Sequence, residues 1–89
     1  MNAIVSVVGQ DKVGIIAAIC NRLANFNINV LDVSQTILQG SFTMFMAVDI
    51  EKATASFREI SDSLSELGKE MNLSIRIHRE DIFDAMHSI

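Results

Sequence analysis

The sequence of 89 residues contains no proline, no tryptophan and no tyrosine, and it has a single cysteine, Cys20. One cysteine excludes an internal disulfide and a thiolate metal cage, and it is typical of the reducing cytoplasm, where we expect the protein to be. A membrane-spanning helix needs about 20 unbroken apolar residues. The longest such stretch, Val13–Cys20, stops at Asn21 and Arg22, so no membrane span is predicted.

Positive charge is also scarce in this chain. Seven Lys and Arg residues stand against eleven Asp and Glu residues, which gives a net charge of −4 and an isoelectric point near 4.9. A protein that binds nucleic acid needs a basic surface to displace counterions. The composition therefore indicates that nucleic acid is not a partner.

Apolar residues, in contrast, are abundant for so short a chain. Hydrophobic residues make up 49% of the sequence and charged residues 20%, and the mean hydropathy is +0.33. At about 100–200 residues per domain, the chain is expected to form one domain over residues 1–89. Because a domain of this size buries only roughly 60–65% of its unfolded surface, the apolar excess predicts a homo-oligomer.

Four segments have the β-branched or alternating apolar pattern of strands. They are Asn2–Val8, Asn29–Leu38, Ser41–Ile50 and Leu73–Arg79. Gln39-Gly40 predicts a hairpin turn between the second and third strands. The third strand is unbroken apolar from Met44 to Val48, which is typical of a strand covered on both faces. Since two helices can cover only one side of so small a sheet, we expect the other side to meet a partner chain.

Three segments have helical spacing. The first helix is predicted to begin after Asp11, whose carboxylate would act as the N-cap, and to end near Asn25–Asn27. The second begins at Ser56-Phe57-Arg58-Glu59, which matches a capping box, and runs to Met71. A short helix over Asp81–Ile89 is predicted from the apolar residues Ile82, Phe83 and Met86. As the alternative to a partner chain, these three side chains would cover the second face of the sheet within one chain.

The order of these elements is strand, helix, strand, strand, helix, strand. It predicts an α+β, ferredoxin-like βαββαβ fold, in which both helices lie on one face of a four-stranded antiparallel sheet, with a C-terminal helical tail over residues 81–89.

The segment Val8–Ile16 carries the strongest signal for a binding site. Its two glycines, Gly9 and Gly14, lie on either side of a predicted helix start, where free amide hydrogens and the helix dipole favour a carboxylate or another anion. The alternative is purely structural: Gly9 makes the turn, Asp11 caps the helix, and Gly14 lets the helix approach the sheet.

No group of residues in the sequence predicts catalysis, a metal or a cofactor. His78 and His87 are isolated and are expected to face solvent, because neither has a cysteine or carboxylate at metal-ligand spacing. Cys20 is expected to be a small buried hydrophobe, since it lies beside Ile16 and Ile19 on the first helix. Acylphosphatases share the predicted topology, but they are associated with an arginine in the first loop, which is absent here. We therefore do not expect an enzyme.

Two motifs that follow one another along the chain resemble those of the ACT domain, a small regulatory module. They are Gly9-x-Asp11-Lys12-x-Gly14-Ile15 and Asn27-Ile28-Asn29-Val30-x-Asp32-x-Ser34-Gln35. Three further segments narrow the resemblance to the stand-alone single-ACT-domain proteins of uncharacterised function. They are Ser34-Gln35-Thr36, Phe42-Thr43-Met44 and Ile82-Phe83-x-Ala85-Met86-x-x-Ile89. The resemblance covers essentially the full length.

The resemblance implies a βαββαβ dimer that binds an amino acid or a similar small effector at its interface. Carried over residue by residue, it assigns the ligand site to one loop and to the start of the second strand of the neighbouring subunit. The implied site residues are Gly9, Gln10, Asp11, Gly14 and Ile15 on one chain and Asn29 on the other. One departure is Val13, where many relatives have a proline, so the loop is expected to be less rigid at that point.

Two hypotheses for the function follow. The first is a cytoplasmic homodimer that senses a small amino acid without chemically changing it. The second is a constitutive adaptor that binds no ligand and docks on a separate enzyme or regulator. Binding of an amino acid would distinguish the first hypothesis from the second.

Overall fold

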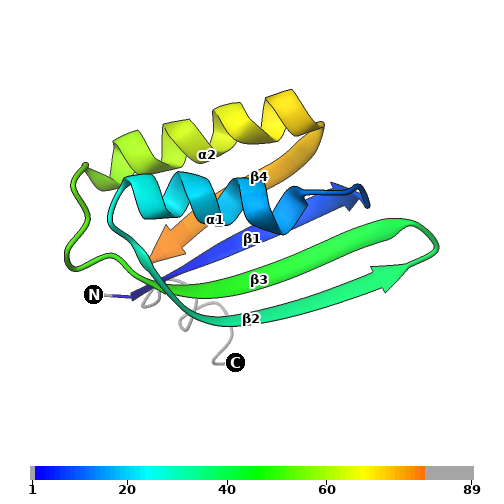
Figure 1. Cartoon of the computed structure of the whole chain (residues 1–89), viewed down its shortest axis with the longest axis horizontal. Helices are drawn as coiled ribbons and strands as arrows, with labels where there is room; N and C mark the ends of the chain where they lie inside the picture. Colours follow the sequence, from blue (N-terminus) through cyan, green and yellow to red (C-terminus); the bar gives the residue numbers. More distant parts are fainter. Residues whose placement is uncertain (1, 80–89) are drawn as a thin grey trace.

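The computed structural model describes residues 2–79. They form six elements, which are β1 (Asn2–Gln10), α1 (Ile15–Asn25), β2 (Asn29–Leu38), β3 (Ser41–Asp49), α2 (Phe57–Met71) and β4 (Leu73–Arg79). The four strands make one antiparallel sheet in the order β2-β3-β1-β4, and both helices lie over the same face (Figure 1). The predicted βαββαβ fold is therefore confirmed. The helix predicted over Asp81–Ile89 lies outside the described residues.

The core lies between the helices and the sheet, and it is built by strict alternation along β1, β3 and β4. In β1, Ala3, Val5 and Val7 are buried, and the residues between them face the opposite side. The same alternation buries every second residue of β3 and β4. These residues are Phe42, Met44, Met46, Val48, Leu73, Ile75 and Ile77. Among residues 2–79, no polar or charged residue is buried, so the core is held by apolar contacts.

The ends of the elements follow the sequence signals closely. Ser56 caps α2 as predicted: its Oγ accepts a hydrogen bond from the main-chain nitrogen of Glu59 at 3.2 Å, and its hydroxyl donates to Glu59 Oε1 at 3.1 Å. The predicted hairpin at Gln39 and Gly40 is also present, with φ angles of 53° and 80° that fit a tight turn between twisted strands. β1 continues two residues past its predicted end at Val8.

β3 contributes less to the exposed apolar surface than we expected for that strand. Four of the apolar side chains of β3 face the helices, and only Phe45, at 44% exposure, and the half-buried Ala47 lie on the opposite face. Six of the other large exposed apolar side chains lie on β2 and around the start of α1. They are Leu31, Val33, Ile37, Leu38, Val13 and Ile16. Val8 of β1 is also exposed.

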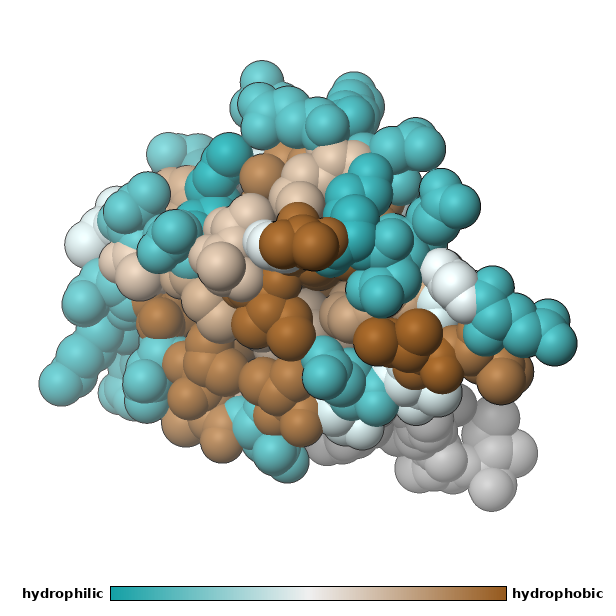
Figure 2. All heavy atoms as spheres, turned by 45° about the vertical axis from the view of Figure 1, so that its right-hand side comes forward, coloured by the Kyte–Doolittle hydropathy of each residue, from teal (hydrophilic) through white to brown (hydrophobic). Residues whose placement is uncertain are grey.

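The position of β2 explains this distribution. It is one of the two edge strands of the sheet, and nine of its ten residues are exposed. Figure 2 is turned toward the hairpin end of the sheet and shows hydrophobic side chains on that surface of the molecule. None of the described helices is long and apolar enough to cross a membrane.

Candidate functional site

The loop between β1 and α1 is held from two sides. The main-chain nitrogen of Asp11 donates to the carbonyl oxygen of Gly40 in the β2–β3 hairpin at 2.8 Å. On the other side, the ammonium of Lys12 donates to the carbonyl oxygen of Met71 at the end of α2. The loop, the hairpin and the end of α2 all lie at the same end of the molecule (Figure 1).

The start of α1 has no side-chain cap. The N-cap is Gly14, with φ 88° and ψ 4°, and no side chain bonds to the first turn. The prediction that Asp11 caps this helix is therefore wrong. The helix begins three residues later, because Gly14 adopts a left-handed conformation that turns the chain into the helix.

The missing cap leaves a row of main-chain donors at the helix start. The first bond inside the helix is the one that Ala18 N donates to Gly14 O at 3.0 Å, so the amides of Ile15, Ile16 and Ala17 have no partner within the helix. The positive end of the helix dipole is at the same place. This geometry favours a carboxylate or another anion.

A cavity of about 350 Å³ lies beside this helix start. It is lined by Asp11, Lys12, Gly14, Ile15, Ile16, Ala17, Gln35, Ile37 and Phe42. The cavity is formed where the first turn of α1 passes over the second half of β2 and the start of β3. Its loop end is polar, and most of its remaining wall is apolar.

Three of the predicted site residues, Asp11, Gly14 and Ile15, line this cavity. The other two residues of the loop region, Gly9 and Gln10, belong to the end of β1. They line a separate hollow of about 310 Å³ with Gln39, Gly40 and Ser41. The predicted loop residues are thus close together in space, but they contribute to two neighbouring depressions.

Asn29 lies far from the loop within one chain. It is the first residue of β2 and pairs with Asp49, whereas the hairpin next to the loop follows the last residue, Leu38. Nine residue steps at about 3.4 Å each separate Asn29 from Leu38 by roughly 30 Å. Asn29 lines its own polar hollow with Asn27, Asp49 and Lys52. A single chain therefore does not unite Asn29 with the other predicted residues.

Several residues of the cavity were missed by the sequence reasoning. Gln35 and Ile37 of β2 pair with Met44 and Phe42 of β3, so both lie on the helix-facing side of the sheet. Alternation in the sequence placed Ile37 on an apolar strand face. It gave no sign that the first turn of α1 lies over that end of β2, because such a contact joins segments twenty residues apart.

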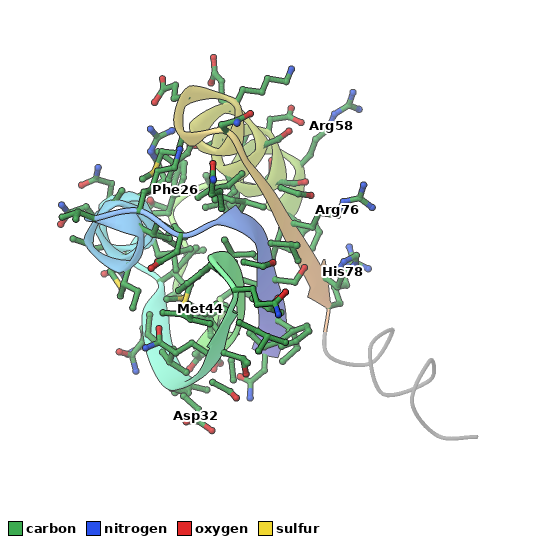
Figure 3. The ribbon with its side chains drawn as sticks, turned by 90° about the vertical axis from the view of Figure 1, so that its right-hand side faces the viewer. Phe26, Asp32, Met44, Arg58, Arg76 and His78 are labelled. Atoms are coloured by element: carbon green, nitrogen blue, oxygen red, sulfur yellow. The ribbon has the colours of Figure 1, made fainter. Side chains whose placement is uncertain are left out.

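No group of three or more histidine, cysteine or acidic residues among residues 2–79 is arranged to hold a metal ion. His78 is half-buried on β4, and its side chain lies on the same side of the molecule as that of Arg76 (Figure 3). Cys20 is half-buried and packs against the core. His87 lies outside the described residues.

Comparison with known proteins decides the family. A family model described as the ACT domain matches residues 2–78. The chain belongs to the ACT domain family. Two relatives of this ACT domain are UPF0237 proteins. The one of Listeria innocua is 48% identical over 89 residues, and the match covers 100% of both chains. The one of Bifidobacterium longum is 49% identical over 87 residues, and the match covers 98% of this chain and 97% of the relative. This ACT domain is therefore a member of the UPF0237 group.

Solved structures agree with this assignment. An ACT domain protein from Streptococcus pneumoniae is 35% identical, with a TM-score of 0.81 and coverage of 93% of both chains. The regulatory subunit of aspartate kinase from Thermus thermophilus has a TM-score of 0.69 at 20% identity, over 89% of this ACT domain and 51% of that chain. The second likeness shows a shared fold.

Proposed function

We propose that this ACT domain is a regulatory module of the cytoplasm, a homodimer that binds an amino acid or a similar small effector without chemically changing it. One observation carries the proposal. The uncapped start of α1, whose first main-chain amides have no partner within the helix, borders a cavity large enough for a small molecule. Membership of a family of regulatory, ligand-binding domains agrees with this geometry.

The ligand's carboxylate would lie against the amides of Ile15, Ile16 and Ala17. Those donors need an acceptor, and water is their only one when no ligand is bound, since no side chain caps the helix. Asp11 lies at the same end of the cavity and would attract the ammonium group of an amino acid. Both charges of a zwitterion would thus find an opposite charge or dipole at the loop.

A second chain would complete the site at the edge of the sheet. If the β2 strands of two subunits pair antiparallel about a two-fold axis, the start of one strand lies beside the end of the other. Such pairing would bring Asn29 of the partner subunit toward the Gly9–Ile15 segment. It would also cover exposed aliphatic side chains of β2, among them Leu31 and Val33.

A thermal-shift measurement with each of the twenty amino acids tests the proposal. A ligand at 100 times its dissociation constant should stabilise the folded dimer by about 2.7 kcal/mol. For a domain of this size, that corresponds to a rise in melting temperature of roughly 10–20 °C. No shift with any amino acid would contradict the proposal and would favour the constitutive adaptor.

A further inference from the structure

We infer that the cavity beside α1 selects an amino acid with an aliphatic side chain, such as valine, leucine or isoleucine. This inference rests on the proposed function, because it assumes that an amino acid binds at the loop. It adds the part of the ligand that neither the family nor the loop specifies, namely the side chain.

The cavity has a polar end and an apolar body. Asp11, Lys12 and Gly14 form the polar end at the loop. The other lining residues, apart from Gln35, are apolar and come from three different elements. They are Ile15, Ile16 and Ala17 of α1, Ile37 of β2 and Phe42 of β3. A ligand whose charged groups occupy the loop end must therefore place its side chain against aliphatic and aromatic carbon.

Two of these apolar residues are exposed in the single chain, although they lie at a cavity. Ile16 is 39% exposed and Ile37 is 53% exposed, while Phe42 behind them is buried. A ligand side chain that fills the space between α1 and β2 would remove apolar surface of both isoleucines from water. A hydroxyl or carboxylate placed against these isoleucines would lose hydrogen bonds to water, and among the described residues Gln35 is the one polar residue of this wall that could replace them.

The volume of the cavity suits a single amino acid. About 350 Å³ lies near the lower end of the range of roughly 300–1,000 Å³ that is usual for small-molecule sites. Gln35 lies two residues before Ile37 on the same face of β2, about 7 Å farther from the hairpin. Within residues 2–79, it is the one polar residue that lines the cavity outside the loop, so apolar side chains are favoured over polar ones.

Isothermal titration calorimetry on the full chain tests the inference with six probes. They are L-valine, L-leucine, L-isoleucine, L-serine, L-threonine and L-aspartate. The first three are expected to bind at least tenfold more tightly than the last three. If a polar amino acid binds as tightly as the aliphatic ones, the inference is overturned while the proposed function stands. If none of the six probes binds and none of the twenty amino acids gives a thermal shift, both are overturned.

A pair of matched variants tests the wall itself. Ile37→Gln replaces an exposed β-branched residue that lines the cavity, and it should weaken binding of the best aliphatic probe by roughly tenfold. Val8→Gln is the control, because Val8 is 49% exposed on β1 and lies neither at the cavity nor on β2. It should change the affinity less than twofold. Equal losses in the two variants would contradict a role for Ile37 in the cavity.

Discussion

Gly68 of α2 lies so close to β4 that a Cβ atom built on it would be 2.6 Å from the main-chain oxygen of Leu73. A glycine inside a helix normally costs about 1 kcal/mol relative to alanine. Here the contact with the strand backbone requires it, since the carbonyl cannot move away as a flexible side chain would. The close approach of α2 and β4 therefore depends on the absence of a side chain at this position.

We expect Gly68→Ala to destabilise the protein by about 1–2 kcal/mol, because overpacking against the backbone outweighs the gain in helix propensity. Chemical denaturation of the variant measures this loss. Ser65→Ala is the control, since Ser65 is exposed on the same helix and should leave stability nearly unchanged. A Gly68→Ala protein as stable as the wild type would show that the helix can shift away from β4.

Gly14→Ala should affect both stability and ligand binding. The φ angle of Gly14 is 88°, and a Cβ atom there would meet nothing within 4 Å. The cost is therefore backbone strain alone, about 1–2 kcal/mol. Gly40→Ala is the matched control, because Gly40 has a φ of 80° and equally open surroundings but does not line the cavity. Both variants should lose similar stability, and only Gly14→Ala should bind amino acids more weakly in calorimetry.

Ser56→Ala should lower the free energy of unfolding by about 1 kcal/mol, because it removes the acceptor for the Glu59 amide at the start of α2. The melting temperature would fall by roughly 4–8 °C. Thr54→Ala, two residues earlier and also exposed, serves as the comparison and should melt within a degree or two of the wild type. If the two variants melt alike, the capping box does not contribute to stability.

The proposed dimer can be tested by placing a charge on either of two faces. Leu31 on β2 and Val8 on the open face of the sheet are 50% and 49% exposed, so each accepts an aspartate without loss of core packing. Sedimentation equilibrium should show a dimer for the wild type and for Val8→Asp, and a monomer for Leu31→Asp. The reverse result would place the interface on the open face, as the sequence of β3 first suggested.

Much of the fold could be predicted from local patterns. The capping box at Ser56, the hairpin glycine Gly40 and the strict alternation in β4 each act through neighbours in the sequence, and each lies where it was predicted. The faces of β3 were harder to predict. An unbroken run such as Met44–Val48 has no alternation to show which side chains turn toward the helices, so its share of the outer face was overestimated.

The site was predicted only in part, for a similar reason. The loop glycines and Asp11 mark it in the sequence, but the N-cap is Gly14, whose left-handed conformation turns the chain into the helix without a side-chain cap. Ile37 and Phe42 join the cavity through strand register. Neither the register nor the position of α1 over β2 has a signature in nearby residues.

The central claim is that an amino acid binds at the start of α1. The most direct test is a titration of the ¹⁵N-labelled full chain with L-leucine, followed through the amide signals of the NMR spectrum. We predict that the signals of Gly14, Ile15, Ile16 and Ala17 shift most, together with Asn29 at the far end of β2. Saturable shifts confined to other parts of the chain, or no shifts with leucine or any other amino acid, would contradict the claim.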